Sequence, residues 1–363
     1  MERILKLCKW AVATAAALAI PGLVCAQHYT QTNLVSDIPG MAPETDPHLR
    51  NAWGLSRSAS SPWWVSNNAD GTATLYKGDG TIVPLVVTIP APKGEAGPGA
   101  PTGTVFNGTT DFELAPGKPA LFLFATATGT ISGWNPQVDG TNAIRKVDNF
   151  HNQAAYTGLA LSQLNGKNVL YVANFRSGEV EVYDTKFQRV QLNGDAFEDH
   201  SGGDHLAPFN VQTVGSNIFV TFAKPGPDGR EVQADGLGFV DVFSPDGRLM
   251  RRLDRGSWFN APWGVVVAPG DFGEFSHDIL VGNLGSGKIA AFNPESLKFR
   301  GFFRNPDNSV MKIDGLWALS FGNNAQAGSS LSLYFTAGPN EGADGLYGSI
   351  TPVPAELNLE IRP

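Results

Sequence analysis

A short phrase recurs six times along this chain at intervals of about fifty residues. Each copy has a small or polar residue, then an aromatic residue or glycine, then an apolar strand. With Gly54, Gly103, Gly158, Asn210, Gly264 and Trp317 taken as equivalent, the intervals are 49, 55, 52, 54 and 53 residues. A period of about 40–50 residues is typical of β-propellers, in which each repeat forms one small sheet. The six copies are NAWGLS (51–56), PTGTVF (101–106), YTGLALS (156–162), APFNVQTV (207–214), APWGVVVA (261–268) and DGLWALSF (314–321).

Each repeat continues with further strands separated by polar turns. In the third repeat, NVLYVAN (168–174), GEVEVYDT (178–185) and FQRVQLN (187–193) alternate apolar with polar or small residues, as half-buried antiparallel strands do. The sixth repeat has no fourth strand, and the segment HYTQTNLVSD (28–37) near the other end of the chain supplies a spare one. We therefore predict an all-β fold, a six-bladed β-propeller closed by that N-terminal strand, which pairs into the last blade.

Composition agrees with a large β protein and excludes several other classes. The 42 glycines and 25 prolines are too many for a helical bundle, and 42% hydrophobic residues are too many for a disordered chain. The formal charge of −8 argues against a nucleic-acid partner, which would require a concentrated basic surface.

The first 26 residues have the pattern of a secretory signal. Three basic residues precede an apolar run from Trp10 to Ile20, and small residues surround the expected cleavage point after Ala26. We expect residues 1–26 to be a cleaved signal peptide and residues 27–363 to be a single propeller domain, located in the periplasm or outside the cell. The three basic residues are Arg3, Lys6 and Lys9.

Two other interpretations of this segment are less favoured. A lipoprotein signal would acylate Cys25, but Val24 stands where such signals have a smaller residue. A transmembrane anchor needs about 20 apolar residues, and this run is shorter. Both cysteines, Cys8 and Cys25, lie in the segment, so the mature chain needs no disulfide to fold.

Several phrases together resemble a family of uncharacterised exported bacterial propeller proteins. More distantly, the chain is similar to NHL-repeat and gluconolactonase-like propellers, whose enzymes hold a divalent metal at one channel mouth with Glu, Asn and Asp. This resemblance implies that Asn174 and Asn283 could be counterparts of such ligands, while the expected glutamate early in the first blade has no clear match. The phrases are NAWGLS, APFNVQ, GFVDVFSPDG, APWGVVVAP, DILVGNLGSGKIAAF, DGLWALSFG and LYFTAGPNEGADGLYGSI.

Polar side chains are expected to converge on one mouth of the propeller channel. In a four-stranded blade, the start of the first strand and the turn after the second strand lie on the same face. Carboxylate and amide oxygens there would suit a hard cation such as calcium. The alternative is that Asn and Asp are ordinary turn residues bonded to their own backbone. The candidate ligand-binding residues are His48, Asn67, His151, Asn152, Asn210 and Asn340, and the candidate metal ligands are Asn174, Asn283 and Asp314.

Other motifs give weaker signals. His200 and His205 lie in a Gly- and acid-rich insertion, where solvated loop histidines are favoured over a metal clamp. The phrase GNLGSGKI (282–289) resembles a phosphate-binding loop but joins two strands, so a hairpin turn is predicted. The three tryptophans at first-strand starts could stack on sugar rings, although packing between the blades is favoured. These are Trp53, Trp263 and Trp317.

The function suggested by these features is binding. We expect a monomeric binding propeller that presents its polar mouth to a small molecule, glycan or protein. The alternative is a divalent-metal-dependent hydrolase or lactonase at the same mouth, and a third possibility is a structural envelope protein. No serine-hydrolase elbow, zincin motif or EF-hand loop occurs in the sequence.

Overall fold

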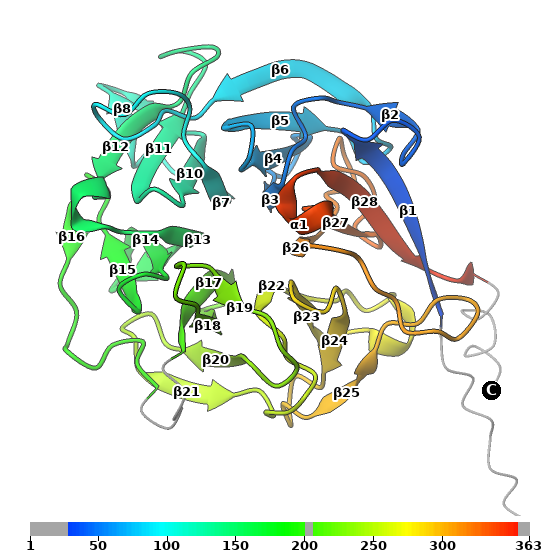
Figure 1. The fold of residues 1–363 in the computed structure, drawn as a ribbon. Coiled ribbons are helices and arrows are strands. Elements are labelled where there is room, and N and C mark those ends of the chain that lie inside the picture. Colours follow the sequence, from blue (N-terminus) through cyan, green and yellow to red (C-terminus); the bar gives the residue numbers. More distant parts are fainter. Residues whose placement is uncertain (1–27, 200–205, 355–363) are drawn as a thin grey trace, which may run out of the picture.

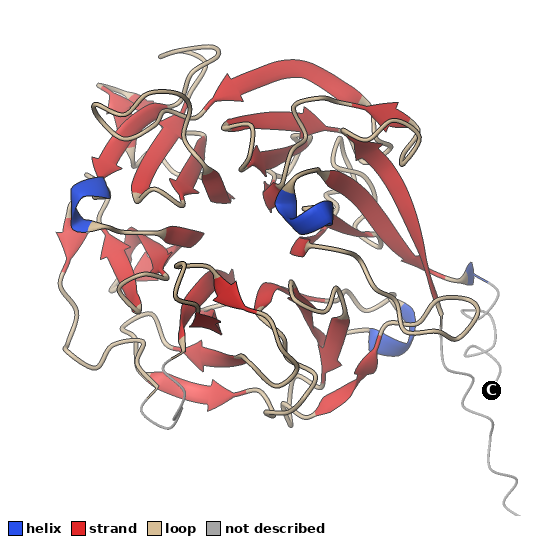
Figure 2. Ribbon diagram, viewed as in Figure 1, coloured by secondary structure: helices blue, strands red, loops and turns tan. Residues whose placement is uncertain are grey.

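Six β-sheets stand around a common axis in the computed structural model, which describes residues 28–199 and 206–354 (Figure 1). Regular structure in these ranges is almost entirely β-strand, with one short α-helix and two 3-10 turns (Figure 2). In each blade the first strand lies nearest the axis and the last lies at the rim (Figure 1). The predicted six-bladed β-propeller is therefore confirmed.

The strands of each blade mostly follow one another along the chain. Blade 1 contains β3 (Ala52–Ser56), β4 (Trp63–Asn67), β5 (Thr72–Tyr76) and β6 (Ile82–Thr88). Blade 2 contains β7 (Pro101–Phe106), β10 (Phe122–Thr126), β11 (Thr130–Trp134) and β12 (Ile144–Asp148). Blade 3 contains β13 (Tyr156–Leu164), β14 (Lys167–Asn174), β15 (Glu179–Tyr183) and β16 (Arg189–Val190).

The second half of the ring repeats this plan. Blade 4 contains β17 (Ala207–Val214), β18 (Asn217–Pro225), β20 (Phe239–Phe243) and β21 (Leu249–Arg252). Blade 5 contains β22 (Pro262–Val267), β23 (Ile279–Asn283), β24 (Ile289–Phe292) and β25 (Phe299–Phe302). Blade 6 contains β26 (Leu316–Phe321), β27 (Leu333–Ala337), β28 (Leu346–Pro352) and β1 (Tyr29–Ser36). Short elements in the connections are β2 (Glu44–Thr45), β8 (Glu113–Ala115), β9 (Lys118–Pro119), β19 (Glu231–Val232), the 3-10 turns Phe150–Asn152 and Gly273–Phe275, and α1 (Pro339–Gly342).

The N-terminal strand β1 closes the ring, as predicted. It pairs antiparallel with β28 from Tyr29 opposite Pro352 to Ser36 opposite Leu346, with one irregularity near Asn33. The side chain of Tyr29 is fully buried, and its hydroxyl donates to the carbonyl oxygen of Phe272 at 3.1 Å. Closure thus joins the two ends of the chain by a strand ladder and also by core packing.

The innermost strands approach one another so closely that glycine is required at the contact. A Cβ built on Gly54 would lie 2.3 Å from the carbonyl oxygen of Thr102, and one on Gly103 would lie 2.6 Å from the amide nitrogen of Leu159. A Cβ on Gly264 would meet the backbone of Trp317 and Leu319. The residue between those two, Ala318, is therefore the counterpart of the glycines. The alignment predicted from sequence, which placed Trp317 there, is wrong by one residue in the last blade.

Tryptophans from three blades fill the axis. Trp53 stacks on Trp317 with ring centroids 3.7 Å apart, and Trp263 meets Trp317 edge-on at 5.9 Å. All three are buried, in one cluster with Phe209 and Phe175. The favoured expectation, that these tryptophans pack between the blades, agrees with this arrangement. We call this cluster the aromatic plug.

Some expectations fall outside the described residues. The predicted signal peptide, residues 1–26, lies there, and so do His200 and His205. Within residues 28–199 and 206–354, none of the helices has the length and apolar character needed to cross a bilayer.

Candidate functional site

A cavity of about 540 Å³ lies at the end of the channel where the innermost strands begin. We call it the mouth cavity. Its lining comes from blades 4, 5 and 6 and from the start of blade 1, and both β19 and α1 contribute to it near the centre of the ring (Figure 1). Its polar and charged lining residues are Asn51, Asp228, Arg230, Glu231, Gln233, Ser286, Lys312, Asp314 and Glu341.

One long connection supplies much of this lining. Residues 226–238 join β18 to β20, where every other blade has a shorter link between its second and third strands. The connection folds back on itself through β19, which pairs with the end of β18. Its start is a tight turn in which the amide of Arg230 donates to Asp228 Oδ1 at 3.0 Å. The turn and the β19 pairing thereby hold charged side chains at the mouth.

The charges around the mouth cavity are not neutralised by one another. Six charged side chains line it, and none forms an ion pair with another residue in the described ranges. Elsewhere in the fold comparable groups are paired, for example Lys298 with Asp254 at 3.2 Å. Carboxylates outnumber cations by four to two in the mouth cavity, so the lining carries a net negative charge. The carboxylates are Asp228, Glu231, Asp314 and Glu341, and the cations are Arg230 and Lys312.

The turn at α1 holds one of these carboxylates in an unfavourable backbone conformation. Asn340 and Glu341 both have positive φ angles, 55° and 59°. Asparagine adopts this left-handed conformation readily, whereas for Glu341 it is unfavourable by roughly 1–2 kcal/mol. The amide of Asn340 donates to Asp314 Oδ2 at 3.0 Å, and its side-chain amide donates to Asp344 Oδ2 at 2.7 Å. Strain retained at a concave polar surface is typical of ligand-binding positions.

The floor of the mouth cavity is the edge of the aromatic plug. Trp317 contributes to the lining although the residue is only 5% exposed. Its indole nitrogen donates to Asn51 Oδ1 at 3.0 Å, and the Asn51 amide in turn donates to Asn68 Oδ1 at 3.2 Å. The inner end of the mouth cavity is therefore formed by an aromatic side chain that a hydrogen bond holds in place.

One of the residues predicted from sequence lines the mouth cavity, and a second is bonded to it. Asp314 lines it, and Asn340 is bonded to Asp314 through its backbone amide. Two others lie deep in the blades. Asn210 is buried at the axis and donates to the carbonyl oxygen of Trp263 at 2.8 Å, and Asn67 donates to Thr72 and Thr74 within blade 1. The amide hydrogens of both are thereby bonded within the fold.

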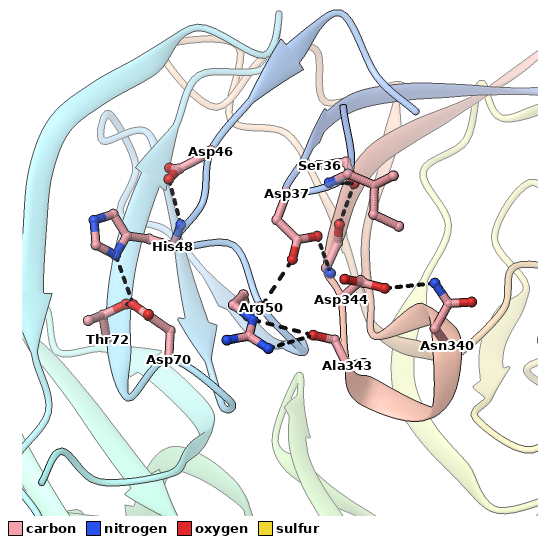
Figure 3. A network of polar contacts seen from close by, with 12 residues as sticks. Ser36, Asp37, Asp46, His48, Arg50, Asp70, Thr72, Asn340, Ala343 and Asp344 are labelled. Atoms are coloured by element: carbon pink, nitrogen blue, oxygen red, sulfur yellow. Dashed lines mark hydrogen bonds and ion pairs between the residues drawn. The ribbon is translucent and has the colours of Figure 1, made fainter. Parts of the chain in front are cut away.

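His48 belongs to a polar network between blade 1 and the β27–β28 connection (Figure 3). Its Nδ1 lies 2.9 Å from Asp70 Oδ2, and the Thr72 hydroxyl donates to the same oxygen at 2.8 Å. Nearby, the Arg50 guanidinium donates to the carbonyl oxygen of Ala343 and lies 4.0 Å from Asp37 (Figure 3). His48 does not line the mouth cavity.

A second cavity of about 580 Å³ lies between blades 2 and 3 and takes in Asn152 and Asn174. Asn174 donates to Glu181 Oε1 at 2.8 Å, and its Oδ1 accepts from the amides of Ala155 and Ser177. Glu181 is buried, and its Oε2 accepts from the hydroxyls of two tyrosines. His151 is exposed, against Phe150, and is not part of this lining. The two tyrosines are Tyr183, at 2.6 Å, and Tyr156, at 2.8 Å.

The three candidate metal ligands do not line one cavity. Asn174 faces the second cavity and Asp314 the mouth cavity, while Asn283 is fully buried and accepts the amide of Asn260 at 2.9 Å. In the described part of the chain, no three His, Cys, Asp or Glu side chains are placed to hold one metal ion. These residues therefore do not make a common calcium site, and calcium binding elsewhere stays a prediction.

Sequence reasoning missed the residues from the long connection, namely Asp228, Arg230, Glu231 and Gln233. A signal was present: the segment from the second to the third strand of the fourth repeat is unusually long. That length could be recognised in the sequence, but the direction in which the connection folds could not.

Comparison with known proteins was informative for the family but not for activity. No family model matches the chain. Uncharacterized protein R648 of Acanthamoeba polyphaga mimivirus is 30% identical over 331 residues, covering 87% of this chain and 78% of that protein. Uncharacterized protein L690 of the same virus is 30% identical over 328 residues, covering 87% and 84%. These relatives are viral and give no support to the expected bacterial family.

Solved structures with the same architecture are much more distant in sequence. Streptogramin B lyase is 11% identical with a TM-score of 0.50, covering 90% of this chain and 98% of that one. A protein of unknown function from Bacteroides thetaiotaomicron is 11% identical with a TM-score of 0.54, covering 89% and 76%. PQQ-bound aldose sugar dehydrogenase from Streptomyces coelicolor is 12% identical with a TM-score of 0.50, covering 90% and 98%. At these identities the similarity shows the fold alone.

Proposed function

The chain belongs to the family of the uncharacterised mimivirus proteins R648 and L690, and on that premise we propose that it is a binding propeller for a small polar ligand at the mouth cavity. The observation that carries this proposal is that six charged side chains line one cavity and that none of them forms an ion pair with another described residue. Charges kept apart in this way are available to a ligand. The strained turn at Asn340 and Glu341 supports the same conclusion.

The charge balance of the lining indicates the kind of ligand. Four carboxylates against two cations favour a molecule whose net charge is positive, and the net charge of −8 attracts such a molecule from solution. A volume of about 540 Å³ is in the usual range for small-molecule sites. We propose binding in preference to metal-dependent hydrolysis, because the three candidate metal ligands, Asn174, Asn283 and Asp314, do not line one cavity.

Thermal unfolding with a panel of probes tests the proposal. Agmatine and L-arginine, which have net positive charge, are expected to raise the melting temperature, whereas succinate and glucose are expected to leave it unchanged. Asp314→Asn combined with Glu341→Gln is expected to weaken agmatine binding about tenfold or more, since each charged hydrogen bond contributes about 1.5–3 kcal/mol.

A matched control removes one negative charge away from the mouth cavity. Glu295 lies exposed in the turn between β24 and β25, so Glu295→Gln is expected to leave agmatine binding unchanged. A stronger effect of succinate than of agmatine, or equal weakening in the control and the double variant, would contradict the proposal.

Export is the second part of the proposed function. We propose that residues 1–26 direct the chain across a membrane and are removed after Ala26. Full-length protein expressed in a Gram-negative bacterium is expected in the periplasm or the medium, with Gln27 as the first residue found by N-terminal sequencing. Cytoplasmic protein that still begins at Met1 would be the opposite result.

A further inference from the structure

A separate cavity of about 310 Å³ lies at the opposite end of the channel and is lined by the innermost strands of five blades. We call it the basal cavity. Its polar lining residues come from β3 and the residue after it, and from β7, β17 and β26. They are Ser56, Arg57, Thr104, Gln212, Thr213 and Ser320.

The basal cavity contains one charge, and that charge has no counter-ion among the described residues. Among the residues that the structure describes, Arg57 is the only ionisable one in the lining. Its guanidinium donates to three neutral carbonyl oxygens, those of Phe321 at 2.7 Å, Gly322 at 2.9 Å and Ser58 at 3.4 Å. Burial without an anion lowers the pKa of Arg57 from its ordinary value, which shows that the charged form is poorly compensated there.

The guanidinium has donors left for a ligand. It carries five N–H groups, and the three bonds above use one on each nitrogen. One N–H therefore remains on each terminal nitrogen, and we call these two donors the Arg57 fork, since carboxylates and phosphates accept from guanidinium N–H groups. The cation also lies over the ring of Trp63, 5.4 Å from its centroid, and this cation–π contact helps to hold the guanidinium in place.

The rest of the lining suits an anion. No carboxylate from residues 28–199 or 206–354 lines the basal cavity, so these residues do not repel an entering anion. The hydroxyls of Ser56 and Thr104 lie 3.1 Å apart and share one hydrogen bond, which leaves one hydroxyl proton free to donate. The exposed side-chain amide of Gln212 adds a further donor at the rim.

This site is distinct from the mouth cavity. The two lining sets have no residue in common, and the aromatic plug separates them. Beneath the plug the channel narrows to a space of only about 20 Å³ between Asn210, Trp263 and Ala318. A ligand at one end therefore does not reach the other.

We propose that the basal cavity binds a small oxyanion, a carboxylate or phosphate group held by the Arg57 fork. This goes beyond the proposed function, which concerns the mouth cavity and a ligand of opposite charge. The alternative role for Arg57 is a purely structural one, since its bonds to Phe321 and Gly322 tie blade 1 to blade 6.

Calorimetric titration with sodium acetate and inorganic phosphate, at constant ionic strength set by chloride, tests the site. Saturable binding of at least one of the two probes is expected, and the probe that binds shows whether the basal cavity takes a carboxylate or a phosphate. Arg57→Gln is expected to weaken that binding about 10- to 100-fold. Absence of saturable binding by both probes overturns the proposal.

A second variant avoids disturbing the contacts between blades. Gln212→Glu places a carboxylate in the lining of the basal cavity, where its negative charge repels an entering anion while the Arg57 bonds to Phe321 and Gly322 remain. It is expected to abolish anion binding with the melting temperature retained. The control is Gln163→Glu, which adds the same charge at an exposed position in β13 outside the basal cavity. Unchanged anion binding in Gln212→Glu would overturn the proposal even if Arg57→Gln fails to fold.

Discussion

A chain that begins at Asp37 is expected to lose cooperative thermal unfolding, because it lacks the strand that closes the ring. Deletion of β1 leaves the edge of β28 unpaired over the whole register from Leu346 to Pro352. It also removes Tyr29 from the core between blades 5 and 6, where its ring stacks on Phe303 with centroids 4.3 Å apart. Circular dichroism at increasing temperature measures the loss.

Point variants at Tyr29 separate the contribution of packing to stability from the contribution of hydrogen bonding. Tyr29→Ala is expected to lower the free energy of unfolding by about 3–5 kcal/mol, as for other large aromatic residues removed from a core. Tyr29→Phe keeps the ring and loses the two bonds of the hydroxyl, which donates to the carbonyl oxygen of Phe272 and accepts from the amide of Phe275, so a loss of about 1–3 kcal/mol is expected. A truncated chain that still melts in one sharp transition near the full-length temperature would show that closure by β1 is dispensable.

The architecture was predictable because it repeats. The period of about fifty residues, the alternation of apolar residues and the spare N-terminal strand can all be recognised in the order of residues along the chain. The first strands of blades 2 and 4 begin and end where the repeated phrases PTGTVF and APFNVQTV do. The alignment of the last repeat was wrong by one residue, at Trp317. This repeat has alanine where most others have glycine, and tryptophan precedes that position in three blades.

The candidate site was harder to predict, for a physical reason. An asparagine at the end of the second strand of a blade can bond either a ligand or the backbone. The neighbouring sequence is the same in both cases. In Asn174 and Asn283 the side-chain oxygen accepts backbone amides, which is the turn role considered as the alternative. Conversely, the importance of Arg57 follows from the absence of a carboxylate among the described residues that line the basal cavity, and such an absence can be recognised only in the folded structure.

Replacing Trp317 by alanine is expected to be the most damaging single change at the axis. The ring stacks on Trp53 and meets Trp263 edge-on, so its removal is expected to lower the free energy of unfolding by about 3–5 kcal/mol. It also leaves Asn51 Oδ1 without its donor at the base of the mouth cavity. Because that base then opens, agmatine binding at the mouth is expected to weaken together with stability.

A tryptophan outside the plug provides the matched control. Trp258 is partly buried, stacks on Phe299 at 4.5 Å and donates to the carbonyl oxygen of Asp254. Trp258→Ala is expected to lower the melting temperature less than Trp317→Ala and to leave agmatine binding unchanged. Chemical denaturation and calorimetry on the two variants separate the effects, since a stability loss alone does not alter affinity in the folded fraction. Equal agmatine affinity in both variants would show that the plug supports the fold without forming the base of the mouth cavity.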